Sequence, residues 1–303
     1  MKISILIGGK AGQGPNILSQ MVGDALVSRG YNVFYTRDYE SLIRGGHNFN
    51  MLTFSDEKVG SNESKADILV CLDEKTKEMH KRDLKKNAQT LDGTHDNMYH
   101  AGALFKILGL EFEFLEERLK KLKNYDENLK HAKEGYAAEK NVFGLKPQKG
   151  KKRFMNGSHG ICEGAIKSGL DLYYAYPMTP ATPLLFELAP KQHESNFLVL
   201  EMESEVSVIN AAIGSAITGA KAMVGTSGGG FDLMTEALSM TGMAEIPMVI
   251  CLAQRPGPGT GVATYSSQGD LKVALGSGHG EFSRLVIAPG NPKECEELTS
   301  QAF

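Results

Sequence analysis

Short apolar runs of strand length alternate with longer segments of helical periodicity along the 303-residue chain. In the first half the strand-like runs are residues 2–7, 31–35, 50–54 and 67–72. A helical pattern begins near Ile17, and from Met98 the chain is helical through Glu134. Strands that alternate with helices predict an α/β domain with a mainly parallel sheet.

The second half repeats this alternation more regularly and predicts a second α/β domain with a parallel sheet. The expected strands are residues 197–202, 221–225, 247–253 and 284–288. The expected helices are residues 205–220, residues 231–243 and a segment after Pro292. Because the chain ends at Phe303 within a helical pattern, we expect this domain to be C-terminally incomplete.

A basic segment separates the two halves. Residues 146–153 (KPQKGKKR) contain five basic residues, interrupted by a proline and a glycine. The formal net charge of the whole chain is −3, which favours a solvated connector over a nucleic-acid patch. We therefore expect two domains, residues 1–148 and 154–303.

Bulk properties exclude several classes of protein. A hydrophobic content of 41% and a charged content of 23% are ordinary for a globular protein. The net charge gives no electrostatic case for binding nucleic acid or an anionic membrane, and no run of 18 apolar residues suggests a membrane span. The N-terminus lacks a signal-peptide cleavage site, so we expect a cytoplasmic protein.

The four cysteines are scattered and form no CxxC pair: Cys71, Cys162, Cys251 and Cys295. Metal and iron–sulfur sites need clustered thiolates, so we expect neither in this chain. Scattered cysteines without a targeting signal also fit a reducing cytoplasm.

Four unusual segments follow expected strands in the second half. They are residues 176–183 (YPMTPATP), 201–205 (EMESE), 226–230 (TSGGG) and 254–261 (QRPGPGTG). In a parallel α/β sheet, ligands bind beyond the carboxyl ends of the strands. These segments together therefore predict one composite pocket, although none of them would be convincing alone.

Each of these segments allows two interpretations. TSGGG exposes backbone amides at a helix start, which suits an anion or a close ligand ring, or it is simply a tight turn. Arg255, in a loop stiffened by prolines, is either a grip for a carboxylate or a surface arginine. Thr179, held between Pro177 and Pro180, is either a positioned hydroxyl or part of a structural turn.

The three glutamates of EMESE present the same choice. A glutamate at the start of a helix is stabilised by the helix dipole, which is the default role. A buried glutamate would instead serve as a proton partner. The spacing of Glu201, Glu203 and Glu205 does not decide which of them is buried.

Two glycine-rich segments lie in the first half. Gly8–Gly14 (GGKAGQG) follows a strand and opens a helix, but its spacing is neither GxGxxG nor a P-loop, so a nucleotide-binding module is only weakly supported. Arg44-Gly45-Gly46-His47 is a second glycine loop, best interpreted as a packed turn with a structural His47.

Taken together, these motifs resemble a known family. GGKAGQG and SLIRGGHNF look like the γ domain of the 2-oxoacid:ferredoxin oxidoreductases. YPMTPATP, EMESE with its following helix, TSGGG, QRPGPGTG, GD-L and HGEF-RLVIAPG look like the pyrimidine-binding domain of the α subunit. The motif order fits over nearly the whole chain. The fusion of γ to α resembles the two-subunit branch, which often acts on 2-oxoglutarate or on a range of 2-oxoacids.

The resemblance implies roles for individual residues. Glu205 matches the glutamate that bonds N1′ of the aminopyrimidine of thiamine diphosphate, whereas Thr179 and Arg255 match substrate contacts. The implied cofactor-binding residues are Tyr176, Pro177, Thr226, Ser227 and Gly228. Possible loops for coenzyme A or for a subunit interface contain Gly12, Gly14, Arg44, Gly45 and Gly46.

The resemblance also implies a reaction and partners. The reaction is oxidative decarboxylation of a 2-oxoacid to acyl-CoA and CO₂ with reduction of ferredoxin, or its reverse. Thiamine diphosphate would bind at the boundary with a β subunit that supplies Mg²⁺ and the iron–sulfur clusters, with coenzyme A as co-substrate. This chain alone would be inactive, and a non-catalytic scaffold fragment is the alternative.

The sequence departs from the family pattern in several loops. The usual GNEA is Gly157-Ser158-His159-Gly160, TSGPG is TSGGG, and QRGGPSTG is QRPGPGTG. These changes affect the fine positioning of cofactor and substrate. Thr179, Glu205 and Arg255 are all retained.

Overall fold

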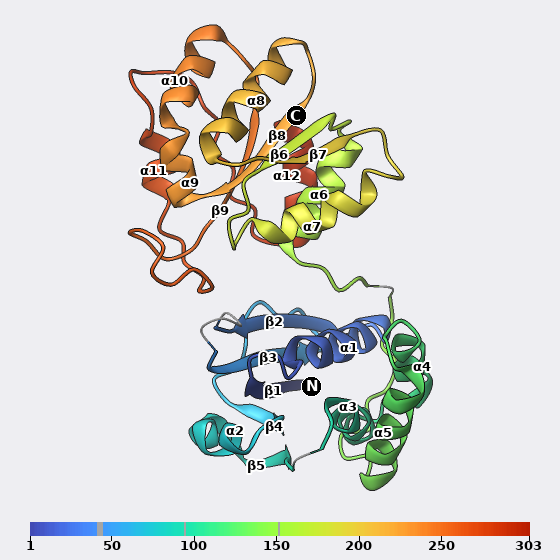
Figure 1. The fold of residues 1–303 in the computed structure, drawn as a ribbon. Helices are drawn as coiled ribbons and strands as arrows, with labels where there is room; N and C mark the ends of the chain where they lie inside the picture. Colours follow the sequence, from blue (N-terminus) through green and yellow to red (C-terminus); the bar gives the residue numbers. More distant parts are fainter. Residues whose placement is uncertain (41–44, 94, 151) are drawn as a thin grey trace. The chain divides into compact units, whose positions relative to one another are not determined.

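The computed structural model describes residues 1–40, 45–93, 95–150 and 152–303. The chain divides into two compact units, Met1–Phe154 and Met155–Phe303 (Figure 1). Most of the basic segment that we expected to be a solvated connector is bound to the first unit. Tyr31 Oη donates to the Lys146 carbonyl at 2.9 Å, and the Gln148 amide donates to the Arg29 carbonyl at 2.7 Å.

The first unit contains a five-stranded sheet in the order β2-β3-β1-β4-β5. Its strands are β1 (Lys2–Lys10), β2 (Asn32–Asp38), β3 (His47–Ser55), β4 (Ala66–Cys71) and β5 (Leu84–Leu91). β4 is parallel to β1 and β5, but β3 is antiparallel to β1 and β2. The sheet is therefore mixed rather than mainly parallel. The short connection between β2 and β3 leaves no room for the crossover helix that parallel pairing requires.

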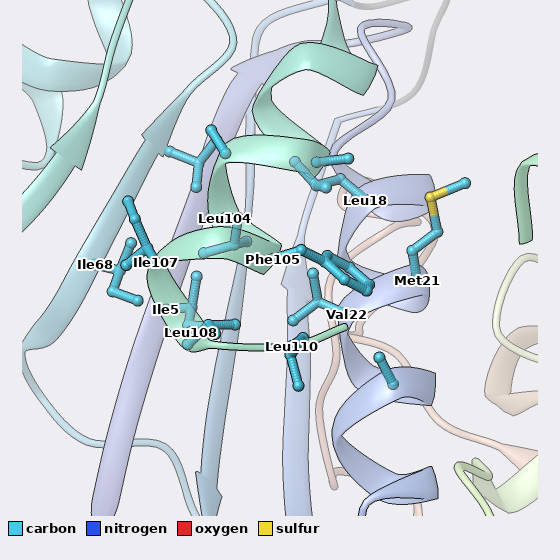
Figure 2. Packing of buried hydrophobic residues seen from close by; sticks show 14 of the residues in the cluster. Ile5, Leu18, Met21, Val22, Ile68, Leu104, Phe105, Ile107, Leu108 and Leu110 are labelled. Atoms are coloured by element: carbon cyan, nitrogen blue, oxygen red, sulfur yellow. The ribbon is translucent and has the colours of Figure 1, made fainter. Parts of the chain in front are cut away.

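Five α-helices belong to the described part of this unit: α1 (Pro15–Ser28), α2 (Glu74–Met79), α3 (Asn97–Leu108), α4 (Phe112–Leu119) and α5 (Tyr125–Ala138). A one-turn helix, η1 (Lys81–Asp83), precedes β5. Figure 2 shows the core where α1 and α3 meet over the sheet, with Leu18 and Val22, Phe105, and Ile5 in one buried cluster. Glycines let α3 and α5 approach closely, because a Cβ on Gly102 would lie 1.9 Å from the Ala132 carbonyl oxygen.

A buried histidine makes the stability of the first unit dependent on pH. His100 of α3 is only 1% exposed, and burial, followed by the nearby His95, lowers its pKa below the ordinary 6.5. The folded chain thus takes up a proton at His100 only at a lower pH than the unfolded chain, which does so at about pH 6.5. The stability that His100 contributes by staying neutral in the folded chain is fully present above about pH 6.5. It is lost as the pH falls from there through the lowered pKa of the folded chain.

We therefore expect the unfolding free energy of the first unit to decrease below pH 6.5, by at most about 1.4 kcal/mol per pH unit for this one group. Denaturant unfolding at pH 7.5 and 5.5, compared between the native chain and His100→Leu, measures the effect. The pKa of His47 is also lowered, chiefly by burial, so part of the dependence should remain in the variant. An identical pH dependence in both proteins would contradict the assignment to His100.

The second unit contains a four-stranded sheet in the order β7-β6-β8-β9. All of its strand pairs are parallel, which confirms the parallel sheet expected for this half of the chain. The strands are β6 (Leu172–Ala175), β7 (Leu198–Glu201), β8 (Ala222–Ser227) and β9 (Val249–Ala253). The helices are α6 (Gly157–Lys167), α7 (Thr182–Lys191), α8 (Glu205–Ile217), α9 (Gly228–Leu233), α10 (Thr235–Ala244), α11 (Leu271–Gly276) and α12 (Pro292–Ala302).

Helices cover both faces of this sheet, as Figure 1 shows. Successive side chains of a strand point to opposite faces, and Tyr173 and Tyr174 of β6 accordingly enter separate cores. Tyr173 packs with Cys162 of α6 and Leu188 of α7, while Tyr174 packs with Ile209 of α8. This double covering explains why the strands are continuous apolar runs.

The strand expected at residues 284–288 is not formed. These residues belong to no strand, and Leu285 is 80% exposed. The Arg284 guanidinium instead donates to the Ala274 carbonyl at 3.2 Å and to the Ser277 carbonyl at 2.5 Å, which ties the segment to α11. An apolar run alone does not make a strand, because it also needs a partner for its backbone.

Within the described residues, none of the helices is both long and apolar enough to span a bilayer.

Candidate active site

The four unusual segments of the second unit lie at one edge of its sheet, as the sequence predicts. In the parallel register Ala175 of β6 pairs with both Glu201 of β7 and Gly225 of β8, and Ser227 of β8 pairs with Ala253 of β9. The chain leaves all four strands at this edge. Ligands of parallel α/β sheets bind at such an edge.

Glu205 is the buried glutamate of EMESE. It is the first residue of α8 and 8% exposed, whereas Glu201 and Glu203 are exposed. Ser204 caps the helix, with its hydroxyl accepting from the Ser207 amide at 3.2 Å. The spacing of the three glutamates does not show which of them is buried, and the structure shows that it is Glu205.

The TSGGG turn provides the space for Glu205. A Cβ on Gly230 would lie 2.4 Å from Thr226 Oγ1 and 3.0 Å from Glu205 Oε1. Thr226 and Ser227 are 1% and 0% exposed, respectively. The absence of a side chain at Gly230 therefore lets the Glu205 carboxylate pack directly against the turn.

Ser227 and Gly228 complete this turn where β8 becomes α9. The Ser227 hydroxyl oxygen is buried and has no hydrogen-bond partner among the described residues. Although Ser227 occupies the N-cap position of α9, its side chain does not cap the helix. Buried hydroxyls normally find a partner, so an orphaned one marks this turn as a place for a ligand or another chain.

Arg255 is buried rather than a surface arginine, at 7% exposed. Its Nη2 donates to Met178 Sδ at 3.8 Å, so the loop after β9 contacts the loop after β6. The Met178 carbonyl accepts from the amides of Ala181 and Thr182, both at 2.8 Å. These bonds hold half-buried Thr179 inside a tight turn beside the arginine.

Among the residues predicted for the site of the second unit, Tyr176 and Pro177 are exposed, with Tyr176 at 38%. They begin the loop after β6 and lie at its rim.

Asp270 is a site residue that the sequence did not single out by its chemistry. Its carboxylate oxygens lie 2.7 and 2.8 Å from the position that a Cβ on Gly228 would occupy. The GD-L motif marked this region in the sequence. The contact of Asp270 with Gly228, however, forms only because the loop after β9 folds back to its own start.

The two glycine loops of the first unit are neighbours. The Ala11 amide donates to the Gly46 carbonyl at 3.2 Å. Gly12 (φ 93°), Gly14 (φ 85°) and Gly46 (φ 125°) have left-handed backbone, as does Gly45, which explains these glycines as turn residues. Arg44 lies outside the described residues.

His47 belongs to a hydrogen-bonded cluster. Its Nε2 is 2.8 Å from His80 Nε2, and His80 Nδ1 is 2.9 Å from Asp83 Oδ2. Within the described residues, no group of three or more His, Cys, Asp or Glu side chains could hold a metal ion.

The second-unit site thus combines three chemical capacities. A buried carboxyl group can exchange a proton with a ring nitrogen. A glycine turn permits close approach of a flat ligand, and a buried guanidinium can bind a carboxylate.

Two family models match the chain. The model for pyruvate ferredoxin/flavodoxin oxidoreductase matches residues 4–93. The model for the thiamine diphosphate-binding part of pyruvate flavodoxin/ferredoxin oxidoreductase matches residues 163–303.

Curated relatives agree with both models. The 2-oxoacid:ferredoxin oxidoreductase subunit alpha of Sulfolobus sp is 30% identical across 97% of this chain and 61% of that protein. The 2-oxoglutarate synthase subunit KorA of Methanocaldococcus jannaschii is 37% identical across 50% of this chain and 42% of that protein. The chain therefore spans about three fifths of the longer relative.

A solved structure shows the same fold. The 2-oxoglutarate:ferredoxin oxidoreductase from Magnetococcus marinus, with 2-oxoglutarate, coenzyme A and succinyl-CoA bound, aligns with a TM-score of 0.84. The alignment covers 99% of this chain and 60% of that chain at 24% identity.

Proposed function

We propose that this chain, a homologue of the α subunits of 2-oxoacid:ferredoxin oxidoreductases, takes part in the oxidative decarboxylation of a 2-oxoacid to acyl-CoA and CO₂. Ferredoxin accepts the electrons, and 2-oxoglutarate is the favoured substrate because KorA subunits are among the relatives. The active protein is a cytoplasmic heteromer with a β subunit. That subunit holds Mg²⁺, the diphosphate of thiamine diphosphate and the iron–sulfur clusters.

One observation carries the proposal. A single carboxylate of EMESE, Glu205, is buried at the same sheet edge as buried Arg255, within the region that matches the thiamine diphosphate-binding family model. A glutamate that only stabilised a helix start would need no burial. Burial of a carboxyl group and a guanidinium at one ligand-binding edge instead supports a catalytic pocket.

The residues present fit the aminopyrimidine of thiamine diphosphate. Gly230 lacks the Cβ that would displace Glu205, which keeps the carboxyl group at the turn where a ring nitrogen would meet it. The buried Ser227 hydroxyl has no hydrogen-bond partner among the described residues and is available to a polar ring substituent. When bound, thiamine diphosphate supplies a nucleophilic carbon and an electron sink for decarboxylation.

The residues of this chain would perform the supporting steps. Glu205 holds or shares a proton at the ring nitrogen N1′, and its burial keeps water from competing for that bond. Thr226, Ser227 and Gly228 shape the wall beside it, and Tyr176 and Pro177 form the rim. Thr179 lies in the turn that contacts Arg255 and positions the oxo end of the substrate.

Arg255 binds the substrate carboxylate in this proposal. We expect Arg255→Ala to weaken substrate binding by about 1.5–3 kcal/mol, because a charge-assisted hydrogen bond is lost. Steady-state kinetics of the assembled enzyme should show this loss mainly as a higher KM for the 2-oxoacid. Arg284→Ala, which removes an arginine held at α11, is the control and should leave KM unchanged. An unchanged KM in Arg255→Ala would remove Arg255 from the substrate site.

The glycine loops of the first unit are proposed to contact coenzyme A or a neighbouring subunit. Gly12, Gly14, Gly45 and Gly46 bring the main chain of two loops together, joined by the bond from Ala11 to Gly46. A glycine-rich loop that leads into a helix start suits a phosphate group.

The decisive experiment is co-expression with the β-type subunit and an assay for 2-oxoacid-dependent reduction of ferredoxin. Turnover should require thiamine diphosphate, Mg²⁺ and coenzyme A, and the chain alone should show none. If an assembled complex turns over no 2-oxoacid, the chain is a scaffold and the proposal fails.

A further inference from the structure

The glycines of the Gly228–Gly230 turn face different neighbours. A Cβ on Gly230 would meet Thr226 and Glu205, whereas the three nearest atoms to a Cβ on Gly228 all belong to the Asp270 carboxyl group, at 2.7–2.9 Å. A Cβ on Gly229 would meet no atom within 4 Å. The first and third glycines therefore each leave room for one acidic side chain, and the middle glycine does not.

Asp270 also contacts the loop that carries Arg255. Its main-chain N–H donates to Gln254 Oε1 at 2.9 Å, and Gln254 directly precedes Arg255. Asp270 thus closes the loop of residues 254–270 onto its own start. One residue links the turn after β8 to the loop after β9.

The Asp270 side chain is held by packing rather than by hydrogen bonds. Its Oδ2 is buried and has no hydrogen-bond partner among the described residues, as is also true of the neighbouring Ser227 Oγ. A buried acceptor without a donor costs free energy. An alanine there would avoid this cost, so hydrogen bonding of its own carboxyl group does not account for an aspartate at this position.

We propose that Asp270 is a positioning residue for the 2-oxoacid: its carboxylate packs on Gly228 and thereby fixes its main-chain N–H, which holds the Gln254 side chain in the loop of Arg255. This inference rests on the proposed function. Gly230, which admits Glu205, then serves the cofactor, whereas Gly228 both forms part of the cofactor wall and admits Asp270. Removing the Asp270 side chain should therefore change KM for the 2-oxoacid and leave kcat nearly unchanged.

The kinetic test uses Asp270→Ala, Asp270→Asn, Gly228→Ala and Gly276→Ala in the assembled enzyme. Asp270→Ala should raise KM roughly tenfold with kcat within about twofold, and Gly228→Ala should raise KM by a similar factor. Asp270→Asn keeps the shape of the side chain and should remain close to the native KM. Gly276→Ala, at the end of α11, is the control and should behave as the native enzyme, because a Cβ there would meet no atom within 4 Å. An unchanged KM, or a fall in kcat alone, for Asp270→Ala would overturn the proposal.

The double variant Gly228→Ala/Asp270→Ala tests the contact itself. Because the three atoms nearest to a methyl group on Gly228 all belong to Asp270, its effect should largely vanish once Asp270 is truncated. The double variant should therefore match Asp270→Ala. Additive increases in KM would show that the two residues act separately and would refute the mechanism.

Hydrogen exchange of the full chain gives a readout that does not depend on turnover. Main-chain amides of residues 254–261 should exchange faster in Asp270→Ala and Gly228→Ala than in the native chain and in Gly276→Ala. If the native complex turns over no 2-oxoacid, the proposed function fails, and this comparison still decides whether Asp270 holds the loop. Equal exchange in all four proteins would overturn the positioning role.

Discussion

Replacing Glu205 with glutamine is expected to lower 2-oxoacid turnover of the assembled enzyme about 100-fold or more, because general acid–base catalysis contributes on this scale. Glutamine keeps the size of the side chain and can still fill the space beside Gly230. It cannot hold a proton at a ring nitrogen as a carboxyl group does. Turnover numbers measured at saturating thiamine diphosphate separate this loss from weaker cofactor binding.

Glu203→Gln is the matched control for this prediction. Glu203 lies two residues away, is exposed, and accepts a hydrogen bond from the Ser207 hydroxyl, which lowers the pKa of its carboxyl group. We expect its replacement to leave turnover unchanged. Full activity in Glu205→Gln, or an equal loss in both variants, would show that the buried carboxyl group is not the proton partner.

Gly160→Ala is expected to destabilise the second unit by about 3 kcal/mol, the upper end of the usual cost of overpacking. A Cβ at this position of α6 would lie 2.1 Å from the Pro292 carbonyl oxygen and 2.8 Å from Cys295 Cβ, both on α12. The nearest obstacle is backbone, so the whole helix must move. Denaturant unfolding, followed by a probe in the second unit, measures the change in free energy.

Gly214→Ala is the corresponding control in α8. Gly214 is exposed, and a Cβ there would meet no atom within 4 Å. Alanine favours helix over glycine, so this variant should be more stable than the native chain by up to about 1 kcal/mol. The same substitution should thus lower the free energy of unfolding at one helical position and raise it at the other. If both variants gained stability, the close contact between α6 and α12 would be wrong.

The sequence predicts those features of the candidate site that follow from the order of strands and loops along the chain. Loops that follow parallel strands share one sheet edge, so placing the strands also placed YPMTPATP, EMESE, TSGGG and QRPGPGTG together. Local patterns could not decide which side chains in these loops are buried. Glu203 and Glu205 differ in that respect although they stand two residues apart, because only Glu205 meets Gly230 on another loop.

The fold likewise has features that the sequence predicts and features that only the tertiary structure settles. The sequence by itself determined the alternation of strands and helices, since periodicity is a local property of the chain. Only the tertiary structure decided the antiparallel place of β3, the failure of residues 284–288 to join the sheet, and the contact of Asp270 with Gly228. Each of these depends on which distant backbone or side chain is available as a partner, and that is settled only when the whole unit packs.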